Sequence, residues 1–108
     1  MGRWLAIVAL GACSGCAGSF GSALHDYDHG RYAEAASTLR EAERDAARWR
    51  GQKRARYALY RGLTHLALGD LPGTARWLGE AKRAADADPL LFSDEEAGRL
   101  ASAWAHLP

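Results

Sequence analysis

The amino-acid sequence predicts an all-α protein built from stacked helix pairs, and three observations support this. The chain has 108 residues, enough for one small domain. It contains only three prolines and is rich in alanine, a composition that favours helix over sheet. It also repeats itself, because Leu24, Gly30 and Leu39 are matched 39 residues later by Leu63, Gly69 and Leu78. A repeat of about this length is typical of stacked helical arrays.

The first twelve residues are expected to be a processed signal peptide. Arg3 provides a positive start, and residues 4–10 form an uncharged apolar run. That run is much shorter than the roughly 20 residues that span a bilayer as a helix. The following residues, Leu10-Gly11-Ala12-Cys13, resemble the bacterial lipobox.

This resemblance implies that Cys13 receives a diacylglycerol group and becomes the mature amino terminus. Cys16 is the alternative lipidation site. Residues 13–19 would then form the lipidated cysteine and a short tether, and residues 20–108 the folded domain. Ser14 follows the cysteine where many bacteria use aspartate to retain lipoproteins, which implies an outer-membrane protein facing the periplasm.

The folded domain is predicted to contain five helices separated by breaks. The first carries Phe20, Leu24 and Tyr27 at helical spacing and ends at Gly30. The second runs from Tyr32 to about Trp49. Gly51 and Gln52 mark the next break. The third predicted helix spans Arg54–Leu68 and ends at Gly69. The fourth runs from Leu71 to about Ala85 and is stopped by Asp88-Pro89.

A capping box opens the last predicted helix. Ser93 is the expected N-cap and Glu96 stands three residues later, the spacing at which each side chain can bond the other's backbone. Leu100, Trp104 and Leu107 follow at helical spacing.

The turn segments resemble those of tetratricopeptide repeats. The resemblance rests on residues 30–35 and 60–71, with small residues at Ala23 and Gly62 and large ones after each turn glycine at Tyr32 and Leu71. It implies a right-handed stack of antiparallel helix pairs, with two repeats and a C-terminal capping helix. The period here is 39 residues rather than the usual 34.

In that family the first helix of each repeat lines a concave groove that binds a partner. Carried over, the groove residues are Phe20, Leu24, Tyr27, Arg56, Leu59, Leu63 and Leu66. Such a groove is expected to hold a peptide by apolar contacts. The alternative is that these apolar stripes pack on one another as core.

The function expected from the anchor and the groove is a protein-interaction module, an adaptor or assembly factor at the cell envelope. The alternative is a structural lipoprotein that forms a homodimer through the same groove. No catalytic motif is recognised, so neither an enzyme nor a cofactor is expected. The net charge of +1 provides no global field for nucleic acid.

Two polar features are expected to be structural. The first is a basic run interleaved with the aromatic residues Trp49, Tyr57 and Tyr60. It is expected to face water, and the alternative is contact with anionic lipid headgroups or an acidic partner. Its basic residues are Arg48, Arg50, Lys53, Arg54, Arg56 and Arg61. The second is the pair His25 and His29, spaced one helical turn apart, which offers too few ligands for a metal ion.

Overall fold

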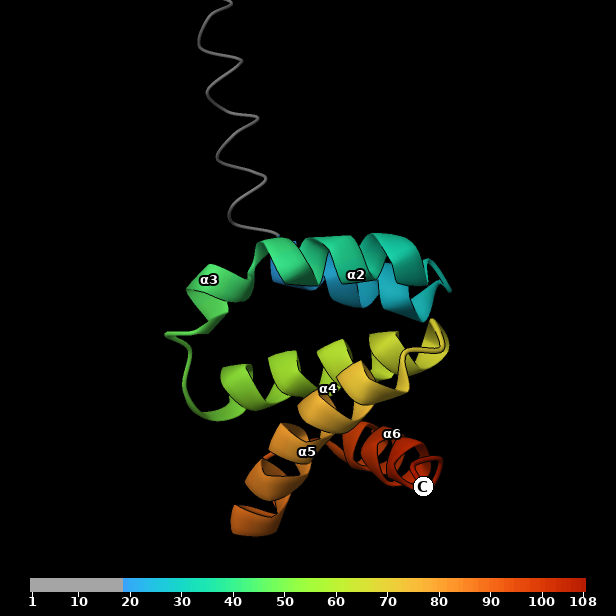
Figure 1. Ribbon diagram of the computed structural model, residues 1–108. Coiled ribbons are helices and arrows are strands. Elements are labelled where there is room, and N and C mark those ends of the chain that lie inside the picture. The colour runs from blue at the N-terminus through green and yellow to red at the C-terminus, as the bar shows by residue number, and fades with distance from the viewer. Residues whose placement is uncertain (1–18) are drawn as a thin grey trace, which may run out of the picture.

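The computed structural model describes residues 19–108, and all the regular secondary structure within this range is helical. Residues 19–28 form the first helical segment. The later helices are α2 (Tyr32–Glu41), α3 (Glu43–Ala46), α4 (Gly51–Ala67), α5 (Leu71–Ala87) and α6 (Asp94–Trp104). The predicted all-α class is therefore confirmed. Figure 1 shows α4 between the layer of residues 19–28 and α2 on one side and α5 and α6 on the other.

The helix breaks follow local chemistry that the sequence reveals. Gly30 and Gly69 adopt φ values of 77° and 82°, a left-handed conformation that glycine takes without a steric penalty. The helix α5 stops before Pro89, and the Ser93 side chain accepts a hydrogen bond from the Glu96 backbone N–H at the start of α6. These predicted boundaries are confirmed.

The predicted single helix from Tyr32 to about Trp49 is wrong. The helix is interrupted at Ala42, and α3 ends at Ala46. At this point the hydroxyl of the buried Tyr57 donates a 2.7 Å hydrogen bond to the carbonyl oxygen of Leu39. The Leu39 carbonyl oxygen therefore has a hydrogen-bond partner outside its own helix. The helix is interrupted there, and the chain then turns toward α4.

The start of α4 also differs from the prediction. The helix begins at Gly51 rather than at Arg54. Gly51 itself has a φ of 59°, so this glycine turns the chain and opens the helix at once.

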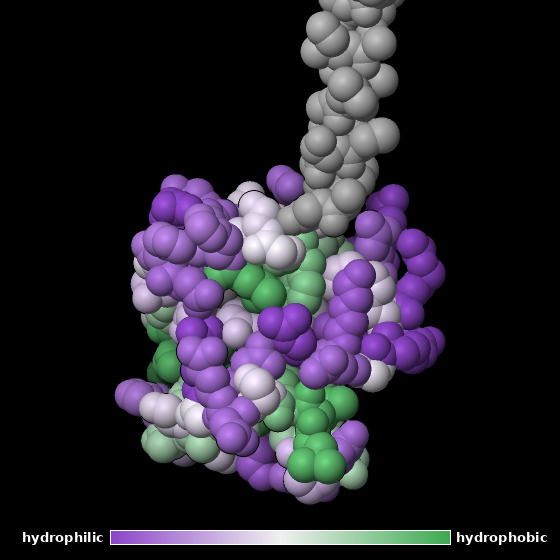
Figure 2. Space-filling view, turned by 180° about the vertical axis from the view of Figure 1, so that it is seen from behind, coloured by the Kyte–Doolittle hydropathy of each residue, from purple (hydrophilic) through white to green (hydrophobic). Residues whose placement is uncertain are grey.

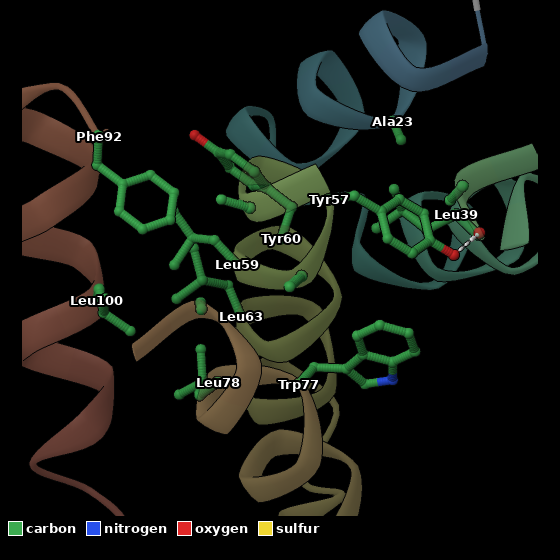
Figure 3. Packing of buried hydrophobic residues seen from close by; sticks show 14 of the residues in the cluster. Ala23, Leu39, Tyr57, Leu59, Tyr60, Leu63, Trp77, Leu78, Phe92 and Leu100 are labelled. Carbon is green, nitrogen blue, oxygen red and sulfur yellow. Dashed lines mark hydrogen bonds between the residues drawn. The ribbon is translucent and has the colours of Figure 1, made fainter. Parts of the chain in front are cut away.

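The hydrophobic core lies on both sides of α4, as Figure 3 shows. On one side Leu59 and Leu63 point toward Phe92, Leu100 and Leu78. On the other side Tyr57 packs edge-on against the Trp77 ring at 5.6 Å and reaches Leu39. Because α4 is covered on both sides, residues 57–64 are buried without interruption.

Gly62 permits the close packing of α4 on α5. A Cβ atom at this position would lie 2.5 Å from Cδ2 of Leu78 and 3.0 Å from its backbone nitrogen. Glycine is therefore needed here for space, whereas at the turns it is needed for its backbone conformation.

Candidate binding cleft

A polar cleft of about 380 Å³ lies between residues 19–28, α4 and α6. Each of the three segments contributes charged or polar side chains to it. The lining residues are Leu24, Asp28, Gln52, Arg56, Tyr60, Ser93, Glu95, Glu96 and Arg99. Residues that are far apart in the sequence thus meet on one surface.

The floor of the cleft is a hydrogen-bonded triad centred on Glu96. This residue is only 6% exposed. Its Oε2 atom accepts hydrogen bonds from Arg56 Nε at 2.9 Å and from the Tyr60 hydroxyl at 3.1 Å. A buried carboxylate needs such partners, and this charge-assisted pair fixes α6 against α4.

The use of Glu96 in this triad explains why the predicted capping box is only half formed. Ser93 caps the Glu96 backbone N–H as predicted. The Glu96 carboxylate bonds Arg56 and Tyr60, and no bond from it to the Ser93 backbone N–H is present.

Arg99 closes the cleft between the first and last helical segments. Its Nη1 donates to the Tyr60 hydroxyl at 3.0 Å and its Nη2 to Asp28 Oδ1 at 3.1 Å. The same Nη2 lies 3.5 Å from Glu95 Oε2. The guanidinium therefore joins residues 71 positions apart.

The pKa shifts in the cleft follow from burial and charge. Burial, helped by the neighbouring Glu96 carboxylate, raises the pKa of Tyr60 to about 12. Burial disfavours the Arg99 cation, but Tyr60, Asp28 and Glu95 outweigh this, so the pKa of Arg99 is raised. Tyr60 thus stays neutral near pH 7, and its hydroxyl keeps its proton for Glu96.

The charges that line the cleft sum to −1. Asp28, Glu95 and Glu96 contribute three negative charges, while Arg56 and Arg99 contribute two positive ones. The rim carboxylates are accessible, because the Asp28 and Glu95 side chains are 51% and 76% exposed. The cleft therefore presents two exposed carboxylates at its rim, which share Arg99, above a floor fixed by Glu96, Arg56 and Tyr60.

The predicted groove residues separate into three groups. Leu24 and Arg56 line the cleft. Phe20, Tyr27 and Leu66 are partly buried and pack against the core.

Leu59 and Leu63 do not line an open groove. They are 0% and 4% exposed and point into the core beneath α6 (Figure 3). These two side chains are part of the core, which was the alternative to a groove, because α6 covers the face of α4 that carries them. The cleft that is present has a mainly polar lining instead of the expected apolar one. Both candidate lipidation sites, Cys13 and Cys16, lie outside the described residues.

Four lining residues of the cleft are not predicted from the sequence: Tyr60, Glu95, Glu96 and Arg99. The pattern indicates Glu96 only as a capping residue and Tyr60 only as an aromatic residue within the basic run. No local signal marks these residues, because Arg56 and Glu96 stand 40 residues apart and Tyr60 and Arg99 stand 39 apart. The fold alone brings each pair together.

The basic run is divided by the fold. Arg54, Arg56 and Arg61 are largely covered and pair with Glu80, Glu96 and Glu43. The other members, Arg48, Arg50 and Lys53, are exposed near the start of α4.

The histidine pair does not extend into a larger cluster of metal ligands. The His25 and His29 rings lie 4.2 Å apart, and His29 Nδ1 donates to the backbone carbonyl of His25. Within residues 19–108, no group of three or more histidine, cysteine, aspartate or glutamate side chains is placed to hold a metal ion.

A second, more apolar pocket of about 490 Å³ lies where the start of α5 meets the end of α6. It is lined by Leu71, Pro72, Ala75, Trp104, Leu107 and Pro108. Although this second pocket is larger, we take the polar cleft as the candidate site, because several oriented polar groups converge in the cleft and none does in the apolar pocket. Such convergence distinguishes a recognition site from an apolar hollow.

Comparison with known protein families, with curated proteins and with solved structures finds no match for this chain. Among the helices of the described part, none is both long and apolar enough to cross a membrane.

Proposed function

We propose that this chain is a protein-interaction module of the bacterial cell envelope, anchored by a lipid at Cys13. In this proposal the helices stack as two tetratricopeptide-like pairs closed by α6. The module holds a segment of a partner protein in the polar cleft and acts as an adaptor or assembly factor. It is not an enzyme.

One observation carries the proposal. Side chains from the first helical segment, from α4 and from α6 meet in one open cleft whose floor is fixed by Glu96, Arg56 and Tyr60. Fixed polar groups lose little conformational entropy when a ligand binds, which favours recognition. Because the rim carries the exposed carboxylates of Asp28 and Glu95, the cleft suits a partner segment that presents a basic side chain.

The test is crosslinked co-purification of a C-terminally tagged chain from its native membranes, followed by mass spectrometry. We expect one enriched envelope protein, and we expect Glu95→Lys to abolish its capture by reversing a rim charge. Asp94→Lys is the matched control, because Asp94 is also exposed in the first turn of α6 but does not line the cleft. Equal capture by both variants would contradict the cleft as the binding site.

The same experiment addresses the anchor and the homodimer. Mass spectrometry of the purified amino terminus should show a diacylglyceryl group on Cys13, or on Cys16 if cleavage occurs there. Self-crosslinks alone would support the structural homodimer instead. Such a dimer would use the exposed apolar pocket, where Leu71 and Trp104 are 45% and 39% exposed, because Leu59 and Leu63 are buried.

A further inference from the structure

Basic and aromatic side chains meet where the described chain begins, beside the start of α4. The Phe20 ring lies 5.5 Å from the Trp49 ring. Lys53 Nζ stands 4.1 Å over the same Trp49 ring. The start of the folded domain is therefore in contact with the start of α4.

The cations here are less neutralised than the rest of the basic run. Arg48 pairs with Asp45, and both side chains are more than two-thirds exposed. Arg50 donates only to the carbonyl oxygens of Ala47 and Trp49. Within the described residues, neither Arg50 nor Lys53 has an ion-pair partner.

An exposed leucine lies on a loop near the start of α4. Leu90 is 91% exposed, which is unusual for a large apolar side chain. Its loop is tied to α4, because Gln52 Nε2 donates to the carbonyl oxygen of Leu91 at 3.0 Å. Trp49, Arg50, Asp88 and Leu91 also line one shared cavity of about 620 Å³, so the loop that carries Leu90 lies near the start of α4.

The molecular surface in this region combines a hydrophilic part and a hydrophobic part. Figure 2 views the molecule from behind and shows hydrophilic side chains on its right, where α3 and the start of α4 lie. A hydrophobic patch lies below them, toward the end of α5. The carboxylates nearest this region are Asp45, paired with Arg48; Glu80, paired with Arg54; and Asp88, which accepts from the Leu90 backbone N–H.

We propose that this basic edge, defined as Arg48, Trp49, Arg50, Lys53 and Leu90, rests on the anionic headgroups of a phospholipid bilayer. Arginine and lysine attract phosphate, tryptophan favours the interface, and an exposed leucine gains by entering the acyl boundary. A single lipid group gives only marginal membrane binding, so a second, electrostatic contact is the usual complement.

A lipid anchor at Cys13 would hold the basic edge close to the membrane, and this part of the inference rests on the proposed function. From Cys13 to Ser19 the chain reaches at most about 20 Å when fully extended. Because Phe20 touches Trp49, the described chain begins in contact with the basic edge. Docking there would fix the orientation of the cleft relative to the membrane.

The test is sedimentation of the full chain with vesicles. Cys13→Ser and Cys16→Ser prevent lipidation, so the result does not depend on the anchor. We expect tighter binding to phosphatidylcholine vesicles with one quarter phosphatidylglycerol than to phosphatidylcholine alone. Arg50→Gln with Lys53→Gln should weaken binding to the anionic vesicles about 25-fold, since each basic residue near such a surface contributes about fivefold. Leu90→Ser should weaken binding to a smaller degree.

The charge-matched control is Arg40→Gln with Arg76→Gln, two exposed residues on α2 and α5 outside the basic edge. This variant should bind the anionic vesicles within about twofold of the unchanged chain. An equal loss in both double variants would show that only net charge matters, and it would overturn the proposal. Unchanged binding of the Arg50 and Lys53 variant would also overturn it and would leave those cations to an acidic protein. Neither outcome bears on partner capture at Glu95.

Discussion

At the scale of single residues, His65 shows how the fold sets a proton affinity. It lies near the end of α4, with Nδ1 3.0 Å from Asp70 Oδ2. Burial lowers the pKa of His65 below its ordinary value of 6.5, and the neighbouring Asp70 only partly compensates. The unfolded chain therefore binds this proton more readily than the folded chain does.

The consequence is a pH-dependent free energy of unfolding. The contribution of neutral His65 is fully present above pH 6.5 and is lost as the pH falls through 6.5 toward the lower folded pKa. We expect the unchanged chain to lose more stability between pH 7.5 and pH 5.5 than His65→Gln, which has no such proton to bind. Urea unfolding at each pH measures the difference. Parallel pH profiles for the two chains would contradict this explanation.

At the scale of helices, two glycines of similar helical setting should respond oppositely to the same substitution. Gly62→Ala places a methyl group against Leu78, and forcing α4 and α5 apart should outweigh the gain in helix propensity. We expect a net loss of about 1 kcal/mol. Gly98→Ala in α6 meets nothing within 4 Å and should gain about 1 kcal/mol from propensity alone. Thermal unfolding followed by circular dichroism distinguishes the two, and a shared sign would refute the packing argument.

The helix boundaries show what the sequence could predict. The breaks at Gly30, Gly69 and Pro89 and the N-cap at Ser93 depend on a few adjacent residues, so they can be predicted locally. The interruption at Ala42 falls next to the hydrogen bond from the Tyr57 hydroxyl to the Leu39 carbonyl oxygen. Because Tyr57 lies on another helix, no local pattern contains that information.

The cleft was harder to predict than the helices. Periodicity identifies the apolar face of a helix, but α4 is covered on two sides, so its pattern did not separate groove from core. The periodicity therefore predicts that Leu59 and Leu63 line a groove, whereas both are buried because α6 covers that face of α4. Arg56 was assigned to the groove and does line the cleft, because a charged residue remains at the edge of a buried face.

At the scale of the whole molecule, α4 joins the two layers into one unit. It bonds α2 through Tyr57 and α6 through the pair Arg56–Glu96. Arg99 then connects α6 back to the first helical segment at Asp28. Stacked repeats usually interact only with their neighbours and can open from an end. Here the last helix contacts the first segment, so we expect the described helices to unfold together.

Leu100→Ala tests this cooperativity, because Leu100 lies on α6 and is only 4% exposed. Removing its buried carbons should cost about 2 to 5 kcal/mol. If the helices form one cooperative unit, amide hydrogen exchange in α2 and α5 should lose the same free energy of protection as α6 itself. Ala101→Ser, an exposed substitution on the same helix, should leave protection in all three helices nearly unchanged. A loss of protection confined to α6 would instead show that this helix opens alone, and the cleft would then open and close with it.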